Sequence, residues 1–248
     1  MLLAMFDHVT IRVGDRAASE RFYDTVLAAL GIDRTYRTRW FTEWEDFSVT
    51  DAGDGDPPTR RLHVAFAAAS REHVDAFWRA GVDAGYTDDG KPGRRPQYGP
   101  DYYGGFLLDP DGNSAEAVHH DRVRHGVMMD HLWIRVADVA AAKRFYDTIA
   151  PHAGLRRGDD TPDRAQFTGT GAGSFSLVSG TPTENLHMAF PSDDDGAIDR
   201  FHQAAVDAGY RSNGEPGERP RYHPGYYSAY VLDPDGNNIE VVNHHRDG

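Results

Sequence analysis

The chain has 248 residues, of which 39% are hydrophobic and 26% charged, and its formal net charge is −13. This composition indicates a folded protein of one large or two small domains, and the acidic excess disfavours nucleic acids and anionic membranes as partners. Cysteine is absent, so disulfides, thiolate nucleophiles and thiolate metal ligands are excluded. The N-terminal segment MLLAM is too short for a signal peptide and the apolar runs are strand-sized, so we expect a cytoplasmic protein.

The first predicted element is a half-buried strand over His8 to Val13, where polar and apolar side chains alternate. A helix follows, with Asp15 as its N-cap and Gly31 as its stop. Shorter strands are expected at residues 35–41 and 47–50. The apolar face of the helix comprises Phe22, Val26, Ala29 and Leu30.

A second set of elements begins with a strand at residues 62–66 and a helix that Ser70 can cap. Residues 90–100, which are rich in Gly, Pro and Arg, are expected to be irregular. Two strands then follow, at residues 103–108 and 114–119, joined by the turn Asp-Pro-Asp-Gly-Asn.

The whole pattern occurs twice in the chain. DHVTIRVGDRAASERFYDT, which starts at Asp7, recurs as DHLWIRVADVAAAKRFYDT from Asp130, and LDPDGN from Leu108 recurs from Leu232. The motifs keep their order and a nearly constant offset, so we predict two domains, residues 1–122 and 126–248. Each domain should contain two strand–helix–strand–strand–strand halves, with helices covering a sheet.

Three residues of the first repeat occupy unexpected places on predicted strands. Side chains alternate across a strand, so His8 and His63 face away from the apolar side that a helix covers. Glu116 lies within an apolar strand, where a carboxylate is costly to bury unless it is paired or bound to a metal. The second repeat has His131, His187 and Glu240 at the matching positions.

Two histidines and one carboxylate that leave open positions suit a divalent Fe, Mn, Ni or Zn ion. The alternative is that each histidine is a hydrogen-bonded strand residue and each glutamate pairs with a nearby arginine. The recurrence of all three positions favours the metal. Because the linker between the repeats is short, we predict that each repeat forms its own group: His8, His63 and Glu116, and separately His131, His187 and Glu240.

The strand order, the helix motif Phe-Tyr-Asp and the LDPDGN turn followed by Glu resemble the vicinal oxygen chelate superfamily of glyoxalases, bleomycin-resistance proteins and extradiol dioxygenases. The resemblance covers nearly the whole chain. It implies an α+β fold of two tandem domains, each a pair of βαβββ modules that form a cupped mixed sheet with a metal on its floor. The ligands that it implies are His8, His63, Glu116, His131, His187 and Glu240.

One position departs from the glyoxalase I pattern. Those proteins usually have a fourth ligand in the fourth strand of the first half, and here Ser48 and Ser176 occupy the matching places. The resemblance therefore favours the extradiol dioxygenase arrangement and disfavours glyoxalase I chemistry on a thiol conjugate.

Tyrosines and arginines near the seventh strand of each repeat are further candidates. The tyrosines can line a substrate pocket or pack an irregular arm, and alternation means that neighbouring pairs cannot both face the cavity. Arg95 and Arg219 can clamp a carboxylate or be exposed loop residues. The histidines that follow each glutamate, at 119, 120, 125, 244 and 245, are interpreted as surface residues. The predicted substrate contacts are Tyr98, Tyr103, Tyr222 and Tyr227.

These features favour a metal-dependent enzyme, a dioxygenase or a lyase or isomerase, that acts on a small organic molecule with two neighbouring oxygens. The alternative is a metal-free protein that sequesters an antibiotic-like ligand in a tyrosine-rich cup. A sequestering protein would not need the His–His–Glu set.

Overall fold

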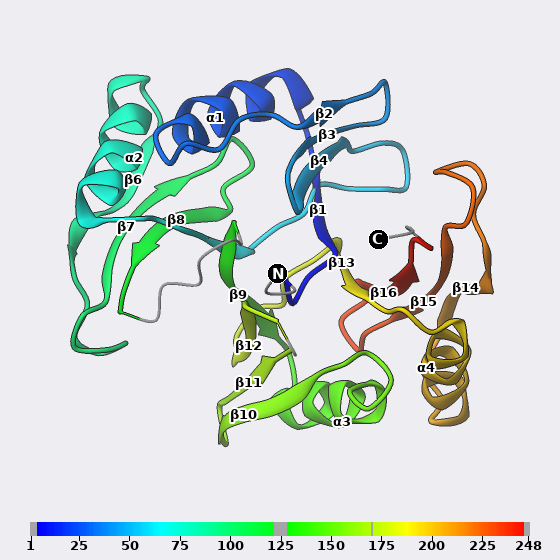
Figure 1. Ribbon diagram of the computed structural model, residues 1–248. Helices are drawn as coiled ribbons and strands as arrows, with labels where there is room; N and C mark the ends of the chain where they lie inside the picture. Colours follow the sequence, from blue (N-terminus) through cyan, green and yellow to red (C-terminus); the bar gives the residue numbers. More distant parts are fainter. Residues whose placement is uncertain (1–3, 122–127, 170, 246–248) are drawn as a thin grey trace. The chain divides into compact units, whose positions relative to one another are not determined.

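The computed structural model describes residues 4–121, 128–169 and 171–245. Within them the same order of elements occurs twice (Figure 1). The first repeat contains β1 (His8–Val13), α1 (Arg16–Ala28), β2 (Tyr36–Arg37), β3 (Phe41–Trp44), β4 (Phe47–Asp51), β5 (His63–Ala67), α2 (Arg71–Asp83), β6 (Thr87–Arg94), β7 (Tyr103–Leu108) and β8 (Ser114–His119). The second contains β9 (Met129–Val136), α3 (Val139–Ile149), β10 (Arg156–Thr161), β11 (Arg164–Thr168), β12 (Ser174–Ser179), β13 (Leu186–Pro191), α4 (Asp195–Asp207), β14 (Ser212–Glu218), β15 (Tyr227–Leu232) and β16 (Asn238–Asn243).

Short-range sequence signals predicted most of these elements. Asp15 caps α1 by accepting a hydrogen bond from the backbone N–H of Ala18, and Gly31 ends the segment with a φ of 78°. Phe22 and Val26 are buried, as predicted for the inner face of α1. Ser70 occupies the N-cap of α2, but its hydroxyl lies 3.0 Å from His73 Nδ1 and makes no cap bond.

Two expectations about strands were wrong. Residues 35–41 do not form one strand, because the hydroxyl of Thr38 accepts bonds from the backbone N–H groups of Trp40 and Phe41 and closes a turn between β2 and β3. Residues 90–100 are not wholly irregular, because β6 continues through Arg94. Its pairing with β7 shifts register near Gly90 and Gly93, and an edge strand tolerates such bulges and a proline.

The described residues divide into two compact units. Of the described residues, 10–121 and 128–133 form the first unit, and 4–9, 134–169 and 171–245 form the second. The division falls inside β1, after Val9, and inside β9, after Trp133. Each unit therefore holds most of one repeat plus the first residues of the other. The domain limits at residues 1–122 and 126–248 stay a prediction about the repeats along the chain.

Each unit contains two sets of hydrogen-bonded strands. In the first unit the orders are β9-β5-β8-β7-β6 and β1-β4-β3-β2. In the second they are β1-β13-β16-β15-β14 and β9-β12-β11-β10. The pairs β5 with β8 and β13 with β16 are parallel, whereas β7 with β8 and β15 with β16 are antiparallel, so the sheets are mixed.

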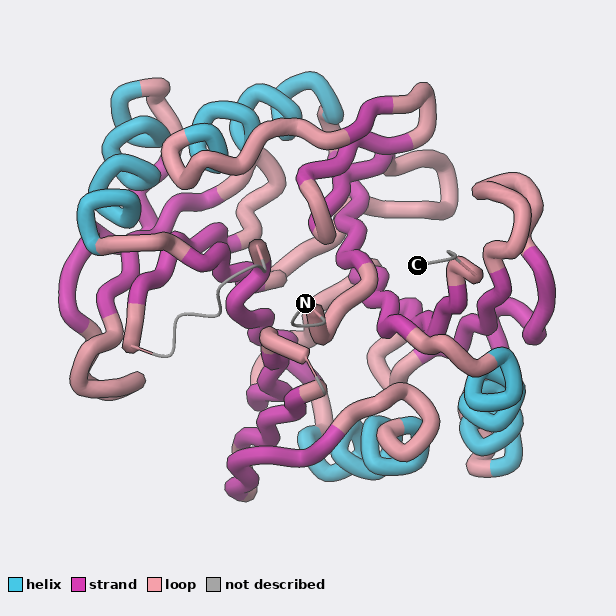
Figure 2. The backbone as a smooth tube through the Cα atoms, in the orientation of Figure 1, coloured by secondary structure: helices cyan, strands magenta, loops and turns pink. Residues whose placement is uncertain are grey.

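In each unit the two helices pack against each other and against the strands (Figure 2). Aromatic side chains contribute to this packing. Phe22 of α1 meets Tyr86, just after α2, edge to face with ring centroids 4.8 Å apart, and Phe145 of α3 meets Tyr210 in the same way at 4.9 Å. Tyr23 is fully buried and donates a hydrogen bond to Asp109 in the turn before β8. Each aromatic pair of this kind stabilises the folded state by roughly 0.5–1.5 kcal/mol beyond the contribution of the apolar area that it buries. No helix among the described residues is long and apolar enough to cross a membrane.

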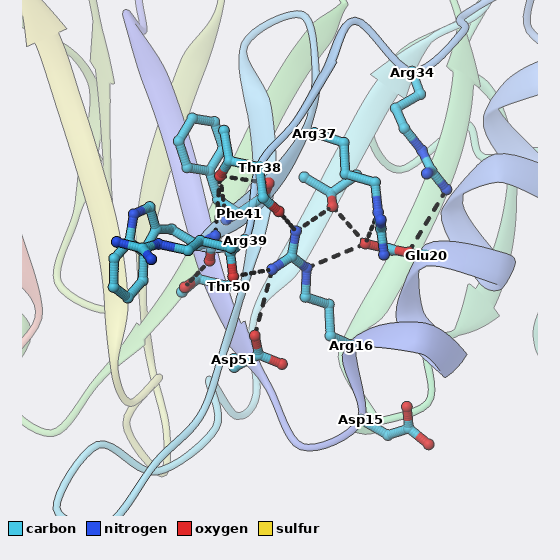
Figure 3. A network of polar contacts seen from close by, with 12 residues as sticks. Asp15, Arg16, Glu20, Arg34, Arg37, Thr38, Arg39, Phe41, Thr50 and Asp51 are labelled. Carbon is cyan, nitrogen blue, oxygen red and sulfur yellow. Dashed lines mark hydrogen bonds and ion pairs between the residues drawn. The ribbon is translucent and has the colours of Figure 1, made fainter. Parts of the chain in front are cut away.

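Charged side chains fasten α1 to the β2–β3 hairpin (Figure 3). Glu20 accepts bonds from Arg16, Arg37 and Thr42, and Arg16 also donates to the carbonyl of Thr38 at 2.6 Å. The Glu20 side chain is only 9% exposed. Burial alone would raise the pKa of Glu20, but the hydrogen bonds and charges of its arginine partners outweigh burial and lower it.

Candidate metal centres

One His–His–Glu group lies in the second unit. His8 of β1 faces His187 of β13 with their Nε2 atoms 3.0 Å apart. Glu240 Oε2, on β16, is 3.0 Å from the Nε2 of His187 and 3.6 Å from that of His8. The parallel pairing of β13 with β16 sets Ala189 opposite Glu240. The backbone N–H of Asp7 bonds to the carbonyl of Ala189, which brings His8 to the same place.

The first unit holds the matching group. His63 Nε2, on β5, is 2.9 Å from Glu116 Oε2, on β8, and the same oxygen is 3.6 Å from His131 Nε2, on β9. The antiparallel pairing of β5 with β9 sets Ala65 opposite His131, and the parallel pairing of β5 with β8 sets Ala65 opposite Glu116. In both groups the candidate ligand atoms lie within 4.8 Å of one another.

The prediction that each repeat supplies its own group is wrong. His8 contributes to the group of His187 and Glu240, and His131 contributes to that of His63 and Glu116. The shortness of the linker had favoured pairing within a repeat, but a short connection equally lets β9 return beside β5. The same six residues make up the two groups, but their distribution between the groups differs from the prediction, and metal binding by them stays a prediction.

An aspartate orients one histidine in each group. His8 Nδ1 is 2.8 Å from Asp7 Oδ1, and His131 Nδ1 is 2.8 Å from Asp130 Oδ1. A carboxylate accepts hydrogen bonds, so each neutral ring carries its proton on Nδ1 and presents the Nε2 lone pair to the centre of the group. The signal was in the sequence, because both repeats open with the dipeptide Asp-His, but the aspartates were not singled out.

A further histidine supports each of these aspartates. His244 Nε2 is 2.9 Å from Asp7 Oδ2, and His120 Nε2 is 3.0 Å from Asp130 Oδ2. Burial would raise the pKa of Asp7, but hydrogen bonds from its two histidines outweigh burial and hold that pKa well below its usual range. The interpretation of His120 and His244 as surface residues was therefore wrong.

The remaining tail histidines make other contacts. His119 Nδ1 is 3.0 Å from the carbonyl of Ala68, and His245 is exposed. His125 lies outside the described residues.

A tyrosine hydroxyl holds the second oxygen of each glutamate. Tyr102 donates to Glu116 Oε1 at 2.7 Å, and Tyr226 donates to Glu240 Oε1 at 2.8 Å. Burial, followed by the charge of the neighbouring glutamate, raises the pKa of both tyrosines, so they remain protonated donors at neutral pH. Burial would raise the pKa of Glu240 as well, but bonds and charges from its histidine partners lower it.

The four tyrosines predicted to contact substrate divide into two kinds. Tyr103 and Tyr227 donate to Asp75 of α2 and Asp199 of α4, each at 2.8 Å, so their hydroxyls are tied to helices. Tyr98 and Tyr222 are 46% and 50% exposed. Their rings pack on those of Tyr102 and Tyr226, with centroids 5.2 Å and 4.8 Å apart, so they stand next to the tyrosines that hold the glutamates.

The donor set fits a divalent metal ion. In the first unit two imidazole Nε2 atoms and a carboxylate oxygen of Glu116, which is 1% exposed, converge on one point. Acceptors that meet in this way repel one another unless a cation or a proton lies between them. Two imidazoles and one carboxylate are also the ligand types that Zn and non-haem Fe prefer.

Other candidates have structural partners. The hydroxyl of Ser48 is 2.8 Å from that of Thr10, and Ser176 accepts a bond from Arg164 at 3.1 Å. Arg95 donates a hydrogen bond to the backbone carbonyl of Lys91, and its guanidinium lies over the Phe106 ring. Both contacts stabilise the segment of chain that carries Arg95. The second unit repeats that arrangement: Arg219 donates to the carbonyl of Glu215 and lies over the Tyr230 ring.

Two cavities differ in their relation to these groups. A cavity of about 450 Å³ in the second unit is bordered by Tyr230, whose ring centroid is 6.3 Å from that of His187. A larger one of about 890 Å³, in the first unit, is bordered by Arg16, Arg37 and Arg39. Neither cavity is bordered by a residue of either His–His–Glu group, and Arg16 and Arg37, at the larger one, are engaged with Glu20.

A family model described as the Glyoxalase/Bleomycin resistance protein/Dioxygenase superfamily matches the chain twice, at residues 5–117 and 128–241. These matches cover most of the sequence, and the chain therefore belongs to this superfamily. No protein with a curated description matches the sequence.

Two solved structures are similar over most of their length. Glyoxalase I from Zea mays is 18% identical, with 96% of this chain and 92% of that chain covered and a TM-score of 0.69. A putative dioxygenase from Bacillus subtilis is 14% identical, with 99% and 87% covered and a TM-score of 0.64. At these identities the likeness establishes the fold, a tandem arrangement of glyoxalase-like α+β domains.

Proposed function

We propose that the protein is a metal-dependent enzyme acting on a small organic molecule with two neighbouring oxygens, and that each His–His–Glu group holds one divalent ion. The observation that carries the proposal is the convergence of two imidazole nitrogens and a buried carboxylate oxygen in each unit. Superfamily membership supports it. Fe, Mn, Ni and Zn all suit the donor set. The ion would supply Lewis-acid polarisation of the substrate oxygens.

Neighbouring side chains orient the ligand atoms of each group. Asp7 and Asp130 hold one histidine each with its Nε2 lone pair inward. Tyr102 and Tyr226 occupy Oε1 of the glutamates, which leaves Oε2 directed at the histidines. This arrangement uses only three protein ligands, so coordination positions stay open for a substrate.

We place the substrate beside Tyr98 and Tyr222, which stand at the exposed side of the tyrosines that hold the glutamates. In the second unit the cavity that Tyr230 borders, about 450 Å³ in volume, lies within the range of small-molecule sites. The choice between a dioxygenase and a lyase or isomerase depends on which ion binds. A cytoplasmic location and the absence of nucleic-acid and membrane partners stay predictions from composition.

Metal content tests the proposal directly. Protein purified anaerobically without added metal should contain a divalent ion, and Glu116→Ala or Glu240→Ala should each lower the content toward half, measured by elemental analysis. Since ligand histidines must be neutral, the content should also fall below about pH 6.5. Unchanged content in both variants would reject these groups as ligands.

Ligand binding separates the enzyme from a metal-free sequestering protein. Calorimetric titration of a hit ligand should give weaker binding to chelated protein than to loaded protein, because the ion would contact the substrate oxygens. Equal affinity in the two forms, with binding lost in Tyr98→Ala or Tyr222→Ala, would favour sequestration by aromatic stacking instead.

A further inference from the structure

The histidine on β5 is held by a chain that ends in a carboxylate. His63 Nδ1 lies 3.2 Å from Ser114 Oγ, and that hydroxyl donates to Asp89 Oδ2 at 2.7 Å. A carboxylate only accepts, so the single proton of the Ser114 hydroxyl points to Asp89. The serine oxygen then accepts from His63, so Nδ1 carries a proton, and Nε2, which lies 2.9 Å from Glu116 Oε2, is the atom left for an ion that displaces the proton between them.

The histidine on β13 is held by amides at the same two positions of the repeat. His187 Nδ1 lies 2.5 Å from Asn238 Nδ2, and Asn238 Oδ1 lies 2.9 Å from Asn213 Nδ2. An amide is a donor at one end and an acceptor at the other, and both amides can be reversed together. In one orientation the ring proton sits on Nε2 and in the other on Nδ1, so this chain does not select a tautomer.

The two groups differ in the hydrogen-bond partner of only one of their two histidines. The other histidine has the same partner in both groups, because Asp7 bonds to His8 as Asp130 bonds to His131, each at 2.8 Å. In these groups it is the Nε2 atoms that converge, so an ion held there needs the Nε2 lone pair of each histidine. The Asp89–Ser114 chain keeps Nδ1 of His63 protonated, so that Nε2 is the atom free to exchange its proton for an ion, whereas the amides behind His187 must first adopt the reversed orientation.

We propose that Asp89 and Ser114 are positioning residues that fix His63 in the metal-binding tautomer and thereby strengthen divalent-ion binding at this group. The inference rests on the proposed function, because it assumes that the groups bind an ion. Loss of a partner behind a ligand histidine typically weakens metal affinity by about 10–100-fold. Replacing the amides of the other unit with the Asp–Ser chain should strengthen binding there.

Calorimetric titration of chelator-stripped, full-length protein with Zn²⁺ measures the effect at one group at a time. The Glu240→Ala background isolates the His63 group, and the Glu116→Ala background isolates the His187 group. In the first background Asp89→Asn and Ser114→Ala should each weaken Zn²⁺ binding by about tenfold or more. Ser114→Ala keeps the charge of Asp89, so an equal loss in both variants identifies the hydrogen-bonded chain and not the nearby charge as the cause.

Two controls separate positioning from a structural role. Ser114→Thr keeps the hydroxyl and should restore the affinity that Ser114→Ala loses. In metal-free protein, ¹⁵N spectra of the imidazoles should show Nδ1 of His63 protonated in the wild type and only partly protonated in Asp89→Asn. In the second background, Asn213→Asp with Asn238→Ser should tighten Zn²⁺ binding.

The outcomes distinguish this inference from the proposed function. Unchanged affinity in both Asp89→Asn and Ser114→Ala, with Zn²⁺ still bound, overturns the positioning role and leaves the metal centres standing. Absence of Zn²⁺ binding in wild-type protein overturns both. Weakened binding with a lost Nδ1–H signal supports the proposal as stated.

Discussion

At the scale of single residues, alternation along a strand decides which of two adjacent tyrosines serves the site. Tyr226 is 6% exposed and bonds to the buried Glu240, whereas its neighbour Tyr227 bonds to Asp199 on the helix-covered side. The hydrogen-bond partner of a buried carboxylate is worth more than a partner at the surface, because losing it leaves a buried charge less well satisfied.

Tyr226→Phe should therefore lower the free energy of unfolding of metal-free protein by about 1–3 kcal/mol. Tyr227→Phe, which removes a hydroxyl from an exposed pair, should cost clearly less. Urea denaturation of both variants in the presence of a chelator, which removes any stabilisation by bound metal, makes the comparison. Equal losses in the two variants would mean that the bond to Glu240 carries no special stability.

At the scale of elements, α1 and its hairpin are joined by charges that the second repeat reverses. Glu20 pairs with Arg37 in the first unit, and the corresponding residues of the second, Lys143 and Asp160, also form an ion pair. The helix and the hairpin thus keep an opposite-charge contact although both signs have changed. Because the ion pair persists with its two charges exchanged, we infer that it stabilises the packing of the helix against the hairpin.

Glu20→Gln should destabilise the protein by about 1.5–3 kcal/mol at pH 7, because a 9% exposed carboxylate loses charge-assisted bonds from its arginines. The folded-state pKa of Glu20 is lowered from 4.5. Its contribution is therefore complete above pH 4.5 and is lost as the pH falls through the folded-state value. Urea denaturation from pH 7 downward should show the difference shrinking below pH 4.5. The exposed Glu72→Gln serves as the control and should cost much less.

A charge exchange in the first unit tests the contact further. Glu20→Lys alone places a cation among Arg16, Arg34 and Arg37 and should destabilise the protein more than Glu20→Gln does. Adding Arg37→Asp recreates the pair that Lys143 forms with Asp160 and should recover part of the loss in thermal denaturation. If the double variant were no more stable than Glu20→Lys alone, the two side chains would not be coupled.

At the scale of the whole molecule, each candidate centre draws one histidine from the other repeat. His8 joins His187 and Glu240, although it precedes them by most of the chain. Neither repeat by itself contains all the residues of a centre. Each candidate centre therefore needs residues from both repeats.

Metal content of double variants tests this arrangement. His8→Ala with Glu240→Ala affects a single centre and should leave about one ion per chain, as either change does alone. His8→Ala with Glu116→Ala affects both centres and should leave almost none. Pairing within each repeat would reverse these two results in the elemental analysis.

The repeat, the fold family and the six candidate ligands could all be predicted from the amino-acid sequence alone. Side-chain alternation is a local property, so the faces of His8 and His63 follow from their own strands. Burial of a carboxylate in an apolar strand is likewise visible locally, as at Glu116. The turn LDPDGN and the cap at Asp15 rest on backbone chemistry that a few neighbouring residues specify.

Which of these residues meet could not be predicted in this way, because it depends on the folded arrangement of the strands. Strand pairing is a contact between distant segments, and the pattern that places His131 on one face of β9 is equally compatible with β5 or another strand as its neighbour. The support of Asp7 by His244 joins residues at opposite ends of the chain, and that of Glu240 by Tyr226 requires the β15–β16 register. Such contacts depend on how strands are assembled into sheets, which periodicity along one strand does not contain.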